Sequence, residues 1–225
     1  MINEIKKKIH IIHNIYVKHK FFIKKKSYSM DGEDLFIKDY FKNKKKGFYV
    51  DVGCYHPTHR NNTFLLHKNG WHGINIDIHK FTIDLFNYLR PKDFNFHFAV
   101  SNTNGVIDMY YQKELSQLST TEDYQAKKVF QGNIKTSKIN SYTLDKILEK
   151  TMLNNIKIDL LDIDVEGADL KVLEGFSIDK YLPELICVEI HDDNLKENKI
   201  FKHLIKFKYD LVWSGVFSHI FKSNI

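Results

Sequence analysis

Residues 47–57 read Gly-Phe-Tyr-Val-Asp-Val-Gly-Cys-Tyr-His-Pro. The apolar run Phe48–Val52 is typical of a buried strand, and the acidic residue, glycine and proline in and after it indicate a tight turn at its end. In a parallel α/β sheet, such a turn at the carboxyl end of a strand binds a nucleoside-bearing cofactor. The stretch therefore predicts an α/β fold with a cofactor site at this strand end.

The rest of the chain continues the alternation of apolar strands and amphipathic helices. The pattern predicts strands at residues 72–76, 94–100, 107–111, 156–163, 185–190, 211–213 and 216–221, and helices at residues 35–41, 64–68, 81–89, 143–150, 168–173 and 195–207. Such an order, closed by an antiparallel pair, predicts an open sheet with helices on both faces. We expect one domain, residues 27–225, in which the polar segment 112–140 is an insertion that faces the substrate.

Residues 1–26, which we call the N-terminal arm, differ from this domain. They contain eight lysines and one glutamate, a net charge of +7, whereas the whole chain carries +6. Their apolar residues recur at helical spacing and predict a basic amphipathic helix. These residues are Ile2, Ile5, Ile9, Ile12 and Tyr16. We expect this face to pack on the domain or on a second copy of the chain in a homodimer; the alternative is peripheral contact with an anionic membrane.

Charge and composition exclude several classes of protein. Outside the arm the net charge is −1 and the arginines are Arg60 and Arg90, so we expect no nucleic-acid partner. No apolar run reaches the ~18 residues of a membrane span, and no signal peptide is recognisable. Cys54 and Cys187 form neither a disulfide framework nor a zinc pattern. We expect a cytoplasmic protein, either free or held at the inner face of the membrane by the arm.

Ionisable residues gather where three of the predicted strands end. The groups are Asp51, Gly53 and His56, then Asp162, Asp164 and Glu166, and then Glu189, His191 and Asp192. Because the carboxyl ends of parallel strands meet at one edge of a sheet, we expect the groups to line one crevice. Asp77 follows Asp51 by 26 positions, where nucleotide-binding βαβ units place the acidic residue that binds ribose hydroxyls. Three roles stay open for His56: contact with the cofactor, contact with the acceptor, or support of the turn.

Several short motifs together resemble one known family. They are residues 28–34 (YSMDGED), 47–57 (GFYVDVGCYHP), 62–63 (NT), 70–77 (GWHGINID), 90–91 (RP), 99–101 (AVS) and 163–167 (IDVEG). In this order they resemble the FkbM family of S-adenosylmethionine-dependent methyltransferases, over residues 28–190. The resemblance implies a class I methyltransferase fold, which is a Rossmann-like, seven-stranded, mostly parallel sheet whose last strand is antiparallel. It also implies O-methylation of a small molecule such as a sugar, a glycan or a polyketide-derived alcohol.

The resemblance further implies which residues bind the cofactor. From the ammonium group through the methionine part and ribose to adenine, they are Glu33, Asp51, Gly53, Cys54, Asp77, Ala99 and Val100, with Asn62 and Thr63 at the border of the site. Three positions depart from the family pattern. Met30 stands where the family often has glutamine, Gly53 is the only glycine of its loop, and Asp162 stands where a non-acidic residue is more frequent. We count Asp162 among the cofactor-side residues with an added role.

Methyl transfer from a sulfonium needs an aligned acceptor oxygen and a base that takes its proton. We expect Asp164, Glu166 and His191 to be catalytic, as base or as substrate anchors; the alternative for His191 is a structural role. Asp164 and Asp192 are also candidate ligands for Mg²⁺ or Mn²⁺, which would lower the pKa of the acceptor hydroxyl. The alternative is a site without metal, in which local hydrogen bonds suffice for the carboxylates.

Together these features predict an S-adenosylmethionine-dependent O-methyltransferase acting on a sugar hydroxyl. The expected partner is a small-molecule sugar, either a nucleotide-activated sugar or a residue of a surface polysaccharide. One alternative is methylation of another acceptor, namely a lipid headgroup, a phosphorylated small molecule or RNA. The other is a non-catalytic protein that uses the cofactor fold for binding.

Overall fold

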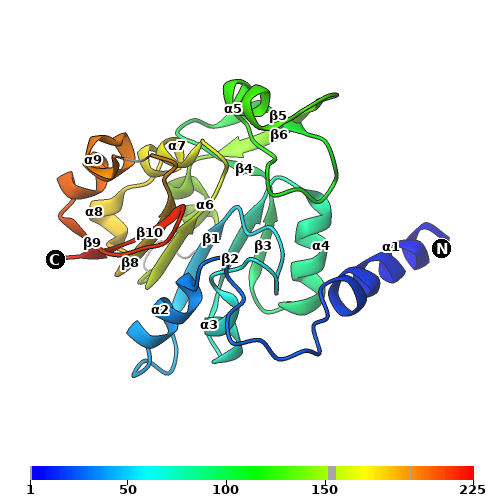
Figure 1. Cartoon of the computed structure of the whole chain (residues 1–225), viewed down its shortest axis with the longest axis horizontal. Coiled ribbons are helices and arrows are strands. Elements are labelled where there is room, and N and C mark those ends of the chain that lie inside the picture. Colours follow the sequence, from blue (N-terminus) through cyan, green and yellow to red (C-terminus); the bar gives the residue numbers. More distant parts are fainter. Residues whose placement is uncertain (1, 152–155, 193) are drawn as a thin grey trace.

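The computed structural model describes residues 2–151, 156–192 and 194–225, and its main sheet has seven strands (Figure 1). In spatial order they are β3 (Phe94–His97), β2 (His72–Asp77), β1 (Phe48–Val52), β7 (Leu160–Ile163), β8 (Leu185–Glu189), β10 (Ser218–Ser223) and β9 (Tyr209–Ser214). Among the described strands of this sheet, β10 alone runs in the opposite direction to all the others. This confirms the predicted α/β sheet with its antiparallel last strand.

Helices cover both faces of the sheet because successive strand residues point to opposite sides. On one face, Tyr49 packs with α2 (Glu33–Tyr40) and α3 (Phe64–Lys68). On the other face, Val50 belongs to the core that contains α6 (Leu144–Lys150), α7 (Asp169–Glu174), α8 (Ile178–Tyr181) and α9 (Lys199–Lys206). The helix α4 (Lys80–Leu89) connects β2 to β3. All five residues of β1 are buried, as a central strand requires.

The order of the strands places a topological switch point between β1 and β7. The chain runs from β1 outward through β2 to β3, and it returns to the other side of β1 with β7 and β8. In sheets of this kind, ligands bind where the connections diverge, outside the carboxyl ends of the strands. Asp51 of β1 and Asp162 of β7 are paired in register at this point, so both predicted acidic groups reach the same crevice.

Two sequence predictions were wrong on the side of β3. The predicted strand 94–100 is divided between β3 of the main sheet and β4 (Ala99–Val100) of a second, three-stranded sheet. The predicted loop 112–140 contains α5 (Asp123–Val129) and β6 (Lys135–Tyr142), which pairs with β5 (Gly105–Tyr111). Most side chains of β6 are exposed or half-buried, so the strand lacks the apolar alternation from which it could have been predicted.

Other boundaries differ by a few residues. The predicted strand 156–163 begins at Leu160, while its neighbouring residues 152–155 lie outside the described part. The predicted helix 195–207 is a 3₁₀ turn, η2 (Leu195–Glu197), followed by α9, whose first turn is capped by the side chain of Asn198. Among the described residues, no helix has the length and apolar character that crossing a membrane requires.

The N-terminal arm differs from its prediction in extent and in packing. It is helical only through α1 (Ile2–Ile12) and a π-helical segment, η1 (His13–Lys18), rather than over residues 1–26. Ile11 and Ile15 are buried against Leu85 of α4. The predicted packing face, represented by Ile5 and Ile9, is exposed. Of the predicted face, Tyr16 packs on the domain beside Tyr88, whereas Ile5, Ile9 and Ile12 do not, because α1 rests on α4 by its other side.

Candidate active site

A pocket opens at the carboxyl ends of β1 and β2, and we call it the strand-end pocket. Four residues that the sequence assigned to the cofactor line it, namely Gly53, Asp77, Ala99 and Val100. Apolar side chains such as Ile78 and Phe98 complete the wall. Part of the segment 112–140 lines the pocket through Ser116, Gln117, Ser119 and Thr121. A pocket that combines apolar wall residues with polar groups is typical of a small-molecule site.

Asp77 is the carboxylate of the strand-end pocket. Its two oxygens accept hydrogen bonds from the backbone N–H groups of Tyr55, at 3.0 Å, and His79, at 2.6 Å. Burial raises the pKa of Asp77 to about 7, against the opposing effect of these hydrogen bonds. The side chain is thus fixed by backbone on both sides, and each oxygen keeps a lone pair for a hydroxyl donor.

Gly53 permits the close approach of β1 to the segment after β7. Its φ is +87°, in the left-handed region, and a Cβ atom at this position would lie 1.8 Å from the carbonyl oxygen of Asp164. Any other residue would push these two strand ends apart. The single glycine of this loop is therefore required by packing between strands as well as by the turn.

A second pocket adjoins the first, and we call it the acidic pocket. Its lining includes six carboxylates and one basic residue, Arg60. The carboxylates belong to Asp31, Glu33, Asp51, Asp162, Asp164 and Glu189. The remaining residues that the sequence assigned to the cofactor, Cys54 and Asn62, also line it. Gly53, Arg60, Gln117 and Asp164 line both pockets, so the two meet at the end of β1.

Asp51 and Asp162 are register partners on β1 and β7, and both line the acidic pocket. Asn61 and Thr63 donate hydrogen bonds to Asp51 at 3.0 and 2.8 Å, and Asn62 donates one to Asp162 at 3.1 Å. Burial and the neighbouring charge of Asp51 raise the pKa of Asp162 to about 8. One carboxyl of the pair therefore keeps a proton near neutral pH, and a bound cation would favour its ionised form.

Arg90 holds the groups that surround Asp51. Its guanidinium is fully buried and donates hydrogen bonds to Thr63 Oγ1 at 2.8 Å, to Asn61 Oδ1 at 2.7 Å and to the carbonyl of Pro57 at 2.6 Å. Thr63 and Asn61 in turn bind Asp51. The planar, multidentate guanidinium fixes the loop after β1 in a way that lysine could not.

The buried carboxyls make the unliganded protein sensitive to pH. Burial and nearby carboxylates raise the pKa of both Asp162 and Glu166 to about 8, far above the range of an unfolded chain. The folded state then binds more protons than the unfolded state, so stability is lost as the pH rises through 8. The loss runs from the unfolded pKa of about 4 to the folded pKa of about 8, at up to roughly 1.4 kcal/mol of stability per pH unit for each such group, so the thermal midpoint should fall between pH 6 and 8 and level off at higher pH.

Calorimetry on an Asp162→Asn variant tests this expectation. Asparagine keeps the acceptor oxygen for Asn62 but has no charge, so the fall should become smaller. The exposed Asp39→Asn serves as the matched control and should behave as wild type. A midpoint that rises with pH in the wild type would contradict the assignment.

The turn after β7 is held in a strained conformation. Glu166 has a φ of +54°, which is uncommon outside glycine, and Gly167 follows with +93°. Asp169 accepts hydrogen bonds from the N–H groups of Val165 and Gly167, and Thr120 of the segment 112–140 donates one to the Glu166 carbonyl at 2.7 Å. These contacts fix the backbone of the turn that carries Asp164 and Glu166.

Glu166, Glu189 and His191 form a cluster in which one side-chain atom of each lies within 4.8 Å of the others. His191 Nε2 lies 2.9 Å from Glu189 Oε2, and this hydrogen bond raises the pKa of His191. Asp192, a predicted metal ligand, is exposed and accepts a hydrogen bond from the N–H of Asn194. The structure therefore brings Asp164 to the junction of the pockets and groups Glu166 with His191, while Asp192 stands apart.

His56 belongs to the support of the site. It is fully buried, its Nδ1 accepts a hydrogen bond from the N–H of Thr58, and its Nε2 lies 3.0 Å from Asn14 Oδ1 in η1. Of the three roles left open by the sequence, this contact pattern matches support of the turn. His56 also links the loop after β1 to the N-terminal arm.

Two adjoining pockets at the switch point of a class I sheet agree with the family resemblance. A model of the methyltransferase FkbM domain matches residues 51–211. The chain belongs to the FkbM methyltransferase family. No curated protein and no solved structure gives a significant match. The matched residues of this FkbM methyltransferase begin at Asp51 and include both strand-end groups of β7 and β8, whereas Glu33 lies before them.

Sequence reasoning missed several residues that build the site of this FkbM methyltransferase. Asn61 and Arg90 hold Asp51, Arg60 and Gln117 lie at the junction of the pockets, and Glu189 lines the acidic pocket. Three of these residues could have been found from the sequence, because Glu189 belongs to a strand-end group and Arg60 and Arg90 are the two arginines of the chain. Gln117 carried none, because its place depends on how the segment 112–140 folds back.

Proposed function

We propose that this protein transfers a methyl group from S-adenosylmethionine to a hydroxyl oxygen of a sugar. The observation that carries the proposal is the junction at which Gly53 and Asp164 line both pockets. A ligand that extends from the strand-end pocket into the acidic pocket has its centre at this junction. Family membership supports methyl transfer; the cofactor, the acceptor and oxygen as the accepting atom are our proposal.

The residues of the two pockets fit the parts of this cofactor. Ile78 and Phe98 offer apolar surface to adenine, and Asp77 offers acceptor oxygens to the ribose hydroxyls. The carboxylates of Glu33 and Asp51 line the acidic pocket, where they suit the ammonium group. When bound, the cofactor supplies an electrophilic methyl group next to a positively charged sulfur.

Asp164 is the residue best placed to act as the general base, because it lies where the pockets meet and is exposed to the cavity. Partial shielding from water and the charges of Glu189 and Glu166 raise its pKa well above the ordinary value. As the acceptor oxygen forms its bond to the methyl carbon and the carbon–sulfur bond breaks, the hydroxyl proton passes to the Asp164 carboxylate. Glu166 and His191 orient the acceptor. Nε2 of His191 lies 2.9 Å from Oε2 of Glu189.

The charge of the acidic pocket supports a sugar over the other acceptors. Six carboxylates against Arg60 would repel phosphate groups close to the transfer point, which disfavours RNA or a phosphorylated centre there. A sugar presents neutral hydroxyls, which donate hydrogen bonds to carboxylates. The phosphates of a nucleotide sugar would have to remain outside this pocket.

A divalent cation is a proposal for the cluster of Glu166, Glu189 and His191. Two carboxylates and one imidazole, with ligand atoms within 4.8 Å, suit Mn²⁺ or Mg²⁺ better than the predicted pair of Asp164 and Asp192. Such an ion would bind acceptor hydroxyls and lower their pKa. Without an ion, His191 and Glu189 form a hydrogen-bonded pair, and the carboxyl group of Glu166 lies beside them.

Calorimetry and a methyl-transfer screen test the proposed function. We expect S-adenosylhomocysteine to bind, and we expect turnover on at least one member of a panel of nucleotide sugars and free glycans. Lipid headgroups, phosphorylated metabolites and RNA complete the panel. Absence of binding by either form of the cofactor would end the proposal, and turnover on RNA alone would overturn the choice of a sugar.

The screen is run with and without a chelator. Loss of turnover that Mn²⁺ restores in the wild type but not in Glu189→Gln would assign the ion to the cluster. Turnover that is unchanged by the chelator would assign the cluster to hydrogen bonding alone.

A further inference from the structure

Part of the N-terminal arm is apolar and uncovered. The side chains of Ile5, Ile9 and Ile12 are 53%, 60% and 45% exposed. Their spacing of four and then three residues places them on one side of α1, and we call them the isoleucine stripe. After the helical part of the arm, Phe22 is 72% exposed. Single exposed apolar residues are ordinary, but a row along one helix marks an interaction surface.

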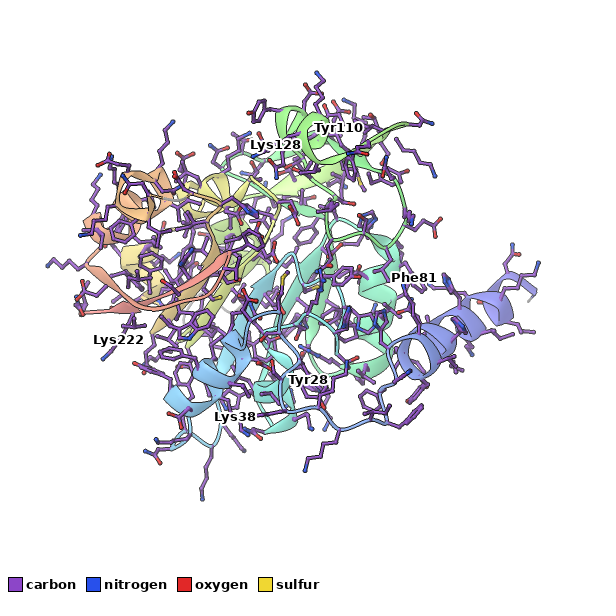
Figure 2. All side chains as sticks on the ribbon, viewed as in Figure 1. Tyr28, Lys38, Phe81, Tyr110, Lys128 and Lys222 are labelled. Atoms are coloured by element: carbon purple, nitrogen blue, oxygen red, sulfur yellow. The ribbon has the colours of Figure 1, made fainter. Side chains whose placement is uncertain are left out.

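The stripe points away from the rest of the molecule. The opposite side of α1 rests on α4, where Ile11 packs with Leu85, His10 stacks on Phe81 at 4.3 Å, and Lys7 forms a 2.7 Å ion pair with Asp84. Figure 1 shows α1 projecting from the body beside α4, and Figure 2 marks Phe81 at this contact. The helix is thus anchored by one side and open on the other.

Lysines flank the stripe on both sides. Lys6 follows Ile5 and Lys8 precedes Ile9, so each lies about 100° around the helix from its isoleucine, in opposite directions. Both lysines are exposed. Beyond η1, the exposed Phe22 is followed by Lys24 and Lys26, which are also exposed. Apolar side chains between lysines are the pattern of a helix that lies in a membrane interface.

We propose that the N-terminal arm docks this protein on the surface of an anionic phospholipid membrane. The isoleucine stripe and Phe22 enter the boundary between headgroups and acyl chains, and the lysines reach outward to the lipid phosphates. A second copy of the chain is a poorer occupant of the stripe, because it would bring together two arms that each carry a net charge of +7.

Docking would also fix the place of the catalytic pockets relative to the membrane. Asn14 of η1 lies 3.0 Å from the buried His56, and the rings of His19 and His59 stack at 4.4 Å. Both contacts join the arm to the loop that continues to Arg60, which lines both pockets. The arm is therefore a rigid attachment to the site, and it would hold the pockets near the membrane surface.

Vesicle flotation of the full chain tests the proposal without any assay of turnover. We expect binding to vesicles of phosphatidylcholine with phosphatidylglycerol, weaker binding at high salt, and little binding to phosphatidylcholine alone. Ile5→Ser/Ile9→Ser should reduce binding by about tenfold or more. Lys6→Gln/Lys8→Gln should reduce it by up to about thirtyfold, at about 1 kcal/mol for each lysine near the surface.

Matched controls lie elsewhere on the surface. Val106→Ser removes an exposed apolar residue of β5, and Lys113→Gln/Lys128→Gln removes two exposed lysines, of which Lys128 is marked on α5 in Figure 2. Controls that bind as wild type support the proposal, provided that the circular dichroism of all variants is the same. Three results would overturn it: no flotation of the wild type, equal losses in the controls, or a dimer in ultracentrifugation that Ile5→Ser/Ile9→Ser dissociates.

Discussion

Replacement of Asp77 by alanine is expected to weaken the binding of S-adenosylhomocysteine by about 100-fold or more. The carboxylate is held by the N–H groups of Tyr55 and His79 with lone pairs left for the ribose, and two hydrogen bonds to a charged group are worth about 1.5–3 kcal/mol each. Isothermal titration calorimetry measures the change. The same substitution should raise KM for S-adenosylmethionine by a similar factor.

Two further variants separate binding from folding. Asp77→Asn keeps an oxygen in place for one backbone donor but loses the charge, so its affinity should lie between those of wild type and Asp77→Ala. Asp39→Ala, on the exposed side of α2, should bind as wild type. If Asp77→Ala folds and binds the cofactor normally, the strand-end pocket is not the nucleoside site.

Replacement of Asp164 by asparagine is expected to lower kcat by about 10²-fold to 10⁴-fold while leaving cofactor affinity nearly unchanged. Positioned general bases contribute factors of this size, and asparagine keeps the shape of the side chain at the junction of the pockets. Single-turnover kinetics with the acceptor found in the screen measures the effect. A wild-type rate in Asp164→Asn would transfer the role of base to His191 or Glu166.

The pH profile gives an independent check on the same residue. Because the base must be ionised, kcat/KM of the wild type should rise with pH until the raised pKa of Asp164 is passed. Glu189→Gln removes a negative charge that contributes to this raised pKa, so the rising limb should move to lower pH. A limb that stays in place would show that another group controls the rate.

The sequence predicted which strand ends and which residues line the site better than it predicted how the strands pair around it. The apolar run before Asp51 and the short runs before Asp77 and Asp162 identified three strand ends, because a central strand that is buried on both faces is mostly apolar. Of the ten residues expected to bind or border the cofactor, nine line one of the two pockets, whereas Thr63 lines neither and donates a hydrogen bond to Asp51. The division of residues 94–100 between two sheets was missed, since strand propensity does not say which neighbour a strand will pair with.

The assignments of catalytic residues and metal ligands depended more on the tertiary structure than the assignments of cofactor-binding residues did. Asp164 lies at the junction of the pockets, whereas His191 lies beside Glu189 and Glu166, and Asp192 accepts a hydrogen bond from the loop before α9. Neighbours on the chain after a strand end can point in different directions, because the backbone there leaves the regular alternation of the strand. The positive φ of Glu166 is one such change of direction.

For the stretch Gly47–Pro57, the sequence by itself determined a buried strand, a glycine turn and the edge of the sheet at which a ligand would bind. It also determined the family, because the motifs occur in a fixed order along the chain. Tertiary structure decided that Gly53 touches the backbone of Asp164, that Arg90 holds the surroundings of Asp51, and which side of α1 rests on α4. The reason is physical. Local patterns record whether a side chain is buried, whereas the identity of its partner, and hence its charge environment and pKa, arises only when distant segments pack together.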